Sequence, residues 1–391
     1  NTYNQHDMKR YISLDVLRGL TVTFMCIVNN PGSWGCMFPP LKHAPWAGCT
    51  PTDLVYPFFI FCMGVAMAFT FSKYNGLDKD GLKKIIKRGI GLFGVGLLLN
   101  LFPFFPLYPH DPDATFWQNW TYWIGHIRIF GVLQRIAMAY VIAGLVALWL
   151  RKPSKIMIAI GGLFILYTGI LVIFGEEPGP FTLEGTISRK IDVALLGENH
   201  VYHGYSFASG ERAAFDPEGI LGGLTAACTA LLGYLVGHVI YTSSKRHAAA
   251  PEDLTAAPSY TVSRIFVYGS LSLALAMILS IWIPISKPLW SASYVLYAGG
   301  WAMLTLAFLM FVIDIKGVEK PFRPFKIMGM NALAAFVLSG ILGKLLPAFG
   351  FRSSAYFGAN EYMSLLYALM FALVIFICSW ALYRKNIIIK L

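Results

Sequence analysis

The feature that most constrains this chain is a series of long apolar runs with few or no charged side chains. Residues 156–175, IMIAIGGLFILYTGILVIFG, contain no charged residue at all. A helix rises about 1.5 Å per residue, so about 20 such residues cross a hydrocarbon core about 30 Å thick. The run is apolar on every side and lacks strict alternation, which excludes a membrane β-barrel.

Runs of this kind recur along the whole sequence and predict an all-α, polytopic transmembrane helical bundle with about ten spans. Only 13% of the residues are charged, against about 25% in an ordinary soluble domain. The predicted spans are residues 12–30, 54–71, 89–108, 129–150, 156–175, 220–241, 265–286, 289–313, 327–346 and 362–383.

Short connections between the runs predict a single membrane domain over residues 1–391. Residues 242–263 have the composition of a flexible inner linker and could divide the bundle into halves, 1–241 and 264–391. Two connections on the predicted outer side are long, residues 31–53 and 176–217. Because long ordered loops often carry function, we expect the site in this region.

The distribution of basic residues predicts the orientation. Most of the 31 Lys and Arg residues fall in segments that lie inside when both termini are cytoplasmic. The formal net charge of +11 is therefore explained by anionic headgroups, and no nucleic-acid partner is expected. The first apolar run is interrupted by Asp15 and Arg18, so we expect an uncleaved anchor instead of a signal peptide.

Charged side chains within the predicted spans need a partner or a purpose, because each costs about 2.5 to 3.5 kcal/mol at mid-bilayer. Asp15 and Arg18 share a helical face, so they either form a salt bridge or leave Arg18 to bind an anion such as phosphate. Arg128 and Arg135 lie two helical turns apart, with Gln134 beside the second. They either pair with buried acids or line an anion-accepting cleft.

Two acidic helix starts lie on the predicted outer face. Thr50-Pro51-Thr52-Asp53 has the pattern of an N-cap followed by proline and an acid. Asp53 is therefore a cap, or it acts with His43 as an acid–base pair at the mouth of the bundle. Asp216 and Glu218 open a later span in a similar way. Nothing in the sequence resembles a metal site, and a Cys36–Cys49 disulfide is possible.

Several motifs together resemble the heparan-alpha-glucosaminide N-acetyltransferase family of transmembrane acyltransferases and its bacterial relatives. They follow one another in the same order along nearly the whole chain. These are SLDVLRGLTV (13–22), VNNPG (28–32), HAPWAGCTPTDLVYPFFIFCMG (43–64), RIFGVLQRIAMAY (128–140), FDPEGILG (215–222), LWSASYVLYAGG (289–300) and GMNALAAFVLS (329–339).

The resemblance implies an enzyme that takes the acetyl group of cytosolic acetyl-CoA and delivers it to an amino sugar across a bacterial inner membrane. It implies that His43, on a loop facing the periplasm, is catalytic and that Asn29 assists. A homodimer is also implied. The sequence departs from the family pattern at Ala47 and Phe130, and Ala47 bears on the identity of the acceptor.

The resemblance and the charge pattern together give a site hypothesis. His43 is the general base, or it carries a transient acetyl group, while Asn29 donates to the oxyanion and Asp53 orients the imidazole. Positive charge on the inner side is expected to bind the phosphates of the donor. The predicted donor-binding residues are Arg18, Lys84, Arg88, Arg128, Gln134 and Arg135, and the predicted acceptor-binding residues are Trp46, Asp216 and Glu218.

Two other functions remain open at this stage. Some bacterial relatives are described as N-acetylglucosamine transporters, and a helical bundle with buried charges is also typical of a permease. The third possibility is an O-acyltransferase that acts on a cell-envelope glycan.

Overall fold

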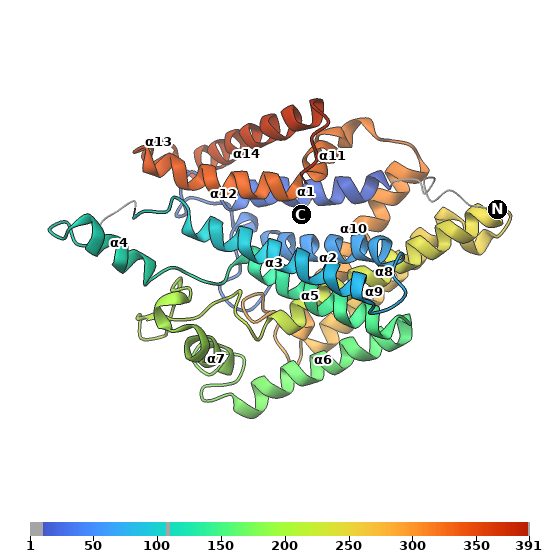
Figure 1. The fold of residues 1–391 in the computed structure, drawn as a ribbon, viewed down its shortest axis with the longest axis horizontal. Coiled ribbons are helices and arrows are strands. Elements are labelled where there is room, and N and C mark those ends of the chain that lie inside the picture. The colour runs from blue at the N-terminus through green and yellow to red at the C-terminus, as the bar shows by residue number, and fades with distance from the viewer. Residues whose placement is uncertain (1–10, 107–109, 390–391) are drawn as a thin grey trace.

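Each apolar run predicted from the sequence folds at least in part into helix in the computed structural model, which describes residues 11–106 and 110–389 (Figure 1). Residues 107–108 of the predicted span 89–108 lie outside the described residues. The long helices are α1 (Ile12–Val28), α2 (Pro51–Phe71), α3 (Lys79–Leu101), α5 (Val132–Leu150), α6 (Pro153–Phe174), α8 (Gly223–Ala249), α9 (Pro258–Leu279), α10 (Ala292–Leu309), α12 (Ala332–Ala348) and α14 (Glu361–Arg384). Shorter helices are α4 (Phe116–Ile124), α7 (Ile187–Leu196), α11 (Arg323–Met330) and α13 (Ser353–Phe357).

The expected count of about ten spans is not confirmed. Among the described residues, 7 helices are long and apolar enough to cross a membrane, namely α2, α5, α6, α8, α9, α10 with its extension to Ile315, and α14. An eighth crossing is possible if α11 and α12 act together, although they are bent by 73° at the break between them. The count falls short because α1 has only 17 residues and the first turns of α3, KDGLKKIIKR, are highly charged.

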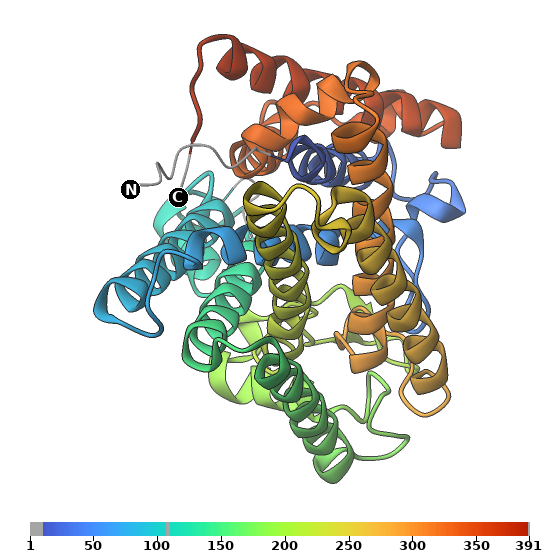
Figure 2. The same ribbon diagram turned by 90° about the vertical axis from the view of Figure 1, so that its right-hand side faces the viewer.

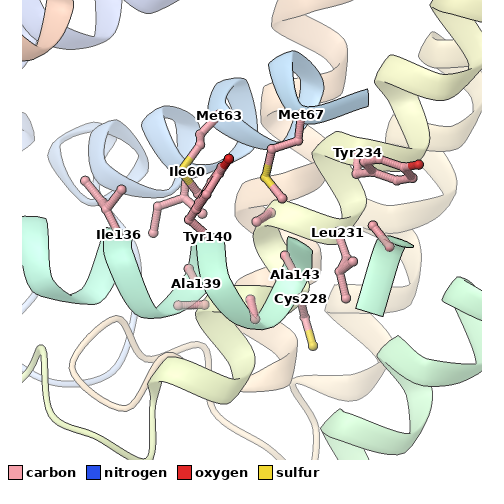
Figure 3. Packing of buried hydrophobic residues seen from close by; sticks show 14 of the residues in the cluster. Ile60, Met63, Met67, Ile136, Ala139, Tyr140, Ala143, Cys228, Leu231 and Tyr234 are labelled. Carbon is pink, nitrogen blue, oxygen red and sulfur yellow. The ribbon is translucent and has the colours of Figure 1, made fainter. Parts of the chain in front are cut away.

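The centre of the bundle lies where α2, α5 and α8 pack together. Figure 3 shows side chains of these three helices pointing toward one another, including Met63, Tyr140 and Leu231. The approach of α2 to α8 is close because glycines face the contact. A Cβ on Gly64 would lie 1.9 Å from the carbonyl oxygen of Ala230. Such small residues let two helix backbones meet within a membrane.

The C-terminal helices form a further layer, which Figure 2 shows as α12 and α14 lying across the rest of the bundle. Gly19 and Gly329 permit a second close approach, between α1 and α11. Lys344 of α12 joins this layer to α3, because its Nζ donates to the carbonyl oxygens of Leu99, Asn100 and Phe102 at 2.6, 3.2 and 3.0 Å. A cation at this position also complements the negative end of the α3 dipole.

The inner linker is shorter than the sequence suggested. Helix α8 continues to Ala249 and α9 begins at Pro258, so only residues 250–257 connect them. Helix α10 packs against α2 and α8, and α1 packs against α11 and α14. Contacts therefore cross between the two expected halves, 1–241 and 264–391, and the division stays a prediction.

One end of the molecule carries the irregular segments. Helices α4, α7 and α13 lie at the left end of Figure 1. The segment 176–217 contains α7 and a short antiparallel pair of strands, β1 (Tyr205–Ser206) and β2 (Arg212–Ala213), in which Tyr205 faces Ala213. We call residues 176–217 the outer segment. It is one of the two long connections in which the sequence predicts the site.

Candidate active site

The first turn of α2 organises the candidate site. Thr50 is the N-cap and Pro51 the first helical residue, and Thr50 and Asp53 form a capping box. Asp53 Oδ2 accepts the backbone N–H of Thr50 at 3.1 Å and that of Ala44 at 2.9 Å. The side chain of Asp53 is 1% exposed. These bonds fix the carboxylate at the start of the helix, with its second oxygen left for another partner.

That partner is His43. Its Nδ1 lies 2.6 Å from Asp53 Oδ1, whereas the imidazole remains 43% exposed. A carboxylate at Nδ1 favours the tautomer with a proton on Nδ1 and a bare Nε2. No hydrogen bond to Nε2 exists within the described residues. The sequence analysis gave helix capping and chemistry with His43 as alternative roles for Asp53. In the structure Oδ2 caps the helix and Oδ1 contacts His43, so the position of Asp53 allows both roles.

Lys287 completes a triangle with these two side chains, and the sequence analysis missed it. Its Nζ lies 3.1 Å from His43 Nδ1 and 3.4 Å from Asp53 Oδ1. Lys287 and His43 are 244 residues apart in the chain, so local patterns do not connect them. The available signal was the position of Lys287 directly before LWSASYVLYAGG, on the predicted outer side, where basic residues are sparse.

An ion-pair cluster lies near this triangle. Arg128 donates from Nε to Asp216 Oδ2 at 2.9 Å and from Nη2 to Asp216 Oδ1 at 2.6 Å. It also bonds Glu218 and lies over the ring of Tyr202 at 4.8 Å. Arg128 is thus neutralised by acids, which is one of the two alternatives that the sequence left open. The structure brings Asp216 and Glu218 together with Arg128.

Trp46 forms an aromatic wall with the outer segment. Its ring packs against Tyr205 and Phe215, with centroids 5.7 and 5.1 Å away. Its indole N–H donates to the carbonyl oxygen of Phe181 at 2.7 Å. These contacts tie the loop that carries His43 to the outer segment, so His43 and the aromatic wall share one region.

Asn29 is exposed at the end of α1. Within the described part of the chain, no hydrogen bond joins it to His43. Its predicted catalytic role therefore stays a prediction. Cys36 and Cys49 are both free thiols here, and the possible disulfide between them is not formed.

A cavity of about 610 Å³ opens beside α1, α2 and α3. Arg18, Lys84 and Arg88 lie in its wall together with Asp15, which accepts a 3.1 Å bond from Arg18. The cavity therefore has a positively charged part. The remaining wall is mostly apolar and consists of Tyr11, Leu14, Phe59, Cys62, Met63, Ala66, Phe69, Thr70, Leu92, Ile136, Met330, Ala332, Leu333, Ile388 and Ile389.

The periodicity of α3 explains why its charges reach this cavity. Lys84, Arg88 and Leu92 follow one another at intervals of four residues, so they share one helical face. The guanidinium of Arg88 lies over the ring of Tyr140 at 4.9 Å. The face thus passes from charged to apolar along the cavity wall.

Gln134 and Arg135 lie outside the cavity wall. Gln134 donates to the carbonyl oxygen of Ile129 at 2.9 Å. Arg135 is 1% exposed, donates to the carbonyl oxygen of Gly219 at 2.9 Å and lies over the ring of Trp290 at 5.2 Å. Its Nε and Nη1 have no hydrogen-bond partner among the described residues. Three of the six predicted donor-binding residues, Arg18, Lys84 and Arg88, are therefore together in the cavity, and Arg128, Gln134 and Arg135 are elsewhere.

Comparison with known proteins confirms the family resemblance. Residues 10–180 match the family model described as heparan-alpha-glucosaminide N-acetyltransferase, catalytic. The human heparan-alpha-glucosaminide N-acetyltransferase is 28% identical over 383 residues, which cover 86% of this chain and 54% of the human protein. The mouse protein of the same name is 27% identical over 376 residues, covering 85% and 54%. The chain thus spans about half the length of these relatives.

Proposed function

We propose that this chain, which is related to the heparan-alpha-glucosaminide N-acetyltransferase family, is a transmembrane acetyltransferase that moves the acetyl group of acetyl-CoA to an amino sugar. The observation that carries this proposal is the arrangement along α2. Asp53, in its first turn, holds His43, and residues from Phe59 to Thr70 of the same helix line the positively charged cavity.

The cavity suits the donor. Acetyl-CoA carries several phosphate groups, and Arg18, Lys84 and Arg88 supply the positive charge that would bind them. The apolar side chains farther along the wall, Met63, Leu92 and Ile136, suit an uncharged acyl arm. Because Asp15 already bonds Arg18, we assign the phosphates chiefly to Lys84 and Arg88.

The distance between the cavity and the His43–Asp53 pair is short enough to be spanned by the arm of acetyl-CoA that carries the acetyl group. At about 1.5 Å per residue, Phe59 lies about 9 Å along the helix axis from Asp53. The phosphates would lie at the Lys84 and Arg88 end, and the thioester would point toward His43.

The chemistry that we propose at His43 is general base catalysis. Nε2 takes a proton from the acceptor amine while the amine nitrogen forms a bond to the thioester carbonyl carbon. The carbon–sulfur bond then breaks, and the proton passes from Nε2 to the departing sulfur. Asp53 holds the imidazole through Nδ1 and stabilises the imidazolium that forms in between. In the covalent alternative, Nε2 itself attacks the thioester and carries the acetyl group.

The acceptor side is assigned to the outer segment and its neighbours. Trp46 offers an aromatic face for a sugar ring, and Glu218, which is 9% exposed, offers a carboxylate for a hydroxyl or ammonium group. Asn29 would donate to the developing oxyanion. We place the His43 loop on the periplasmic side of a bacterial inner membrane and both termini in the cytoplasm. A homodimer stays a prediction.

The test of this proposal is transfer of labelled acetyl from acetyl-CoA to glucosamine by the purified full chain. His43→Ala should lower the rate by about 10² to 10⁴, because general base catalysis contributes about that much. His126→Ala is the matched control, since His126 is an exposed histidine that bonds the carbonyl oxygen of Tyr122, and it should keep the parent rate. A His43→Ala protein as active as the parent would remove His43 from its role.

Transport of an amino sugar is the second candidate, favoured by one observation. The 73° break between α11 and α12 is a discontinuity of the kind that transporters use for binding. Thermal stabilisation separates the two proposals, because a ligand that binds the folded protein raises its melting temperature. Stabilisation by CoA supports the acetyltransferase, whereas stabilisation by the sugar alone supports transport.

A further inference from the structure

Lys287 is a third charged side chain in contact with the His43–Asp53 pair. Its Nζ, His43 Nδ1 and Asp53 Oδ1 form a triangle with sides of 2.6, 3.1 and 3.4 Å. The Lys287 side chain is 19% exposed. It therefore belongs to the site and is not a freely solvated surface lysine.

The loop that carries Lys287 is rigidly held. The backbone N–H of Gly48 donates to the carbonyl oxygen of Ile285 at 2.7 Å, which joins this loop to the loop of His43. Ser286 and Ser291, both buried, bond each other across Lys287, with Ser286 N–H donating to Ser291 Oγ at 3.1 Å. The Lys287 backbone is thus fixed between two anchored residues, and the contacts of Nζ with His43 and Asp53 place the ammonium group.

The hydrogen-bonding capacity of Nδ1 decides what Lys287 can do. This nitrogen either donates a proton to Asp53 or accepts one from Lys287, but it cannot do both. The shorter distance to Asp53 favours donation to the carboxylate. The Lys287 ammonium then pairs with Asp53 Oδ1 and stands beside the imidazole as a positive charge.

We propose that Lys287 is a positioning residue for the acetyl transfer reaction: its positive charge keeps the resting His43 imidazole neutral, with Nε2 bare and ready to accept a proton. A cation 3.1 Å from Nδ1 opposes formation of the imidazolium, whereas Asp53 favours it. The positive charge of Lys287 thus acts against protonation of the resting base, and the carboxylate of Asp53 compensates the charge of the imidazolium when the proton arrives. This inference rests on the proposed function, because it assigns a role within that reaction.

The other groups that face Lys287 are consistent with this role. They are Asp53, Glu218 and Cys49. Burial lowers the pKa of Lys287 from its ordinary value, and the carboxylates of Asp53 and Glu218 act in the opposite direction. Burial raises the pKa of the Cys49 thiol to about 12, so Cys49 brings no charge at neutral pH. The charges at this site are then those of the triangle and of Glu218, which is itself paired with Arg128.

The test reads the ionisation of His43 without using activity. Diethyl pyrocarbonate modifies a histidine only in its neutral form, and His43 is exposed enough to react. We would follow the modification of the His43 peptide by mass spectrometry against pH in the full chain. Lys287→Met should raise the midpoint by about one pH unit, because a neighbouring charge of like sign shifts an ionisation by about that much. Lys287→Arg keeps the charge, so its midpoint for His43 modification should stay within about 0.3 pH unit of the parent midpoint.

The His126 peptide of each protein is the internal control, since His126 bonds the carbonyl oxygen of Tyr122 and no hydrogen bond or ion pair joins it to Lys287 within the described residues, so its midpoint should not move. Lys287→Gln replaces the methionine variant if that protein does not fold. A His43 midpoint unchanged by loss of the charge, or moved equally by Met and Arg, overturns the inference. A shifted midpoint in a chain that transfers no acetyl group would show that Lys287 acts on the ionisation of His43, but it would reject the proposed function and with it a role for Lys287 in acetyl transfer.

Discussion

Asp53 shows how one side chain can serve both the fold and the chemistry. Its Oδ2 caps α2 through two backbone N–H groups, and its Oδ1 holds His43. Because the capping bonds fix the carboxylate, the imidazole is oriented without loss of side-chain freedom during the reaction. The sequence signature of the cap, Thr50-Pro51-Thr52-Asp53, was therefore also the signature of the candidate site.

The residues of the site differ in how far sequence could locate them. His43 and Asp53 are close in the chain and belong to one motif, so their pairing could be predicted. Lys287 reaches them only through the tertiary fold. Arg128 could be assigned to either of two charge environments, and only the folded chain brings it to Asp216 and Glu218. The charges on α3 were predictable because regular helical spacing places them on one face.

Asp192, on α7 in the outer segment, gives a pH-dependent prediction. It is fully buried, and its Oδ1 accepts the backbone N–H of Ile220 at 2.8 Å. Burial raises its pKa to about 7, above the value of about 3.9 for an unfolded chain. Between about pH 4 and pH 7 the folded protein holds a proton that the unfolded chain has lost, so stability falls as pH rises through this window.

The melting temperature of the parent in detergent should therefore be higher at pH 5 than at pH 8. Asp192→Asn keeps an acceptor for Ile220 but does not titrate, so this difference should shrink. Asp113→Asn, at an exposed position, is the matched control and should keep the parent difference. An undiminished difference in Asp192→Asn would show that another group is responsible.

At the scale of secondary-structure elements, the break between α11 and α12 has a structural purpose. Asn331 lies at this break and is 1% exposed. Its amide donates to the carbonyl oxygen of Ile387 and accepts the N–H of Ile389, both at 2.9 Å. The C-terminal residues Ile388 and Ile389 are thereby held in the wall of the charged cavity. The sequence places Asn331 within the predicted span 327–346, but it does not reveal which residues the side chain bonds.

We predict that Asn331→Ala weakens donor binding. Each of the two lost hydrogen bonds contributes about 0.5 to 1.5 kcal/mol, so KM for acetyl-CoA should rise about tenfold while KM for the acceptor stays unchanged. Asn119→Ala, which removes a buried asparagine bonded to the backbone of Asp111 near α4, is the control for loss of stability. A folded Asn331→Ala protein with the parent KM for acetyl-CoA would contradict this assignment.

At the scale of the whole molecule, the helices could be predicted but the number of crossings could not. Apolar runs identify helices because a segment in lipid has no water to bond, so its backbone N–H and C=O groups must bond one another within the segment. Whether a helix crosses completely depends on its length and on where its charges lie, as α1 and α3 show. The close packing of α2 on α8 depends on Gly64 and Gly233 meeting backbone from the partner helix, which one sequence alone does not reveal.

The molecule as a whole places a positively charged cavity and a histidine–carboxylate pair along one helix. In the proposed function, this arrangement separates donor binding from acceptor binding. We therefore propose that the acetyl group passes from the side of Lys84 and Arg88 to the side of His43, while the donor itself does not cross the membrane.

Sided transfer in inverted membrane vesicles tests this claim most directly. Labelled acetyl-CoA is supplied only outside the vesicles and glucosamine only inside, with His43→Ala vesicles as the control. We expect labelled N-acetylglucosamine inside parent vesicles and little inside the control vesicles. Product that forms only when both substrates are on the same side would contradict it.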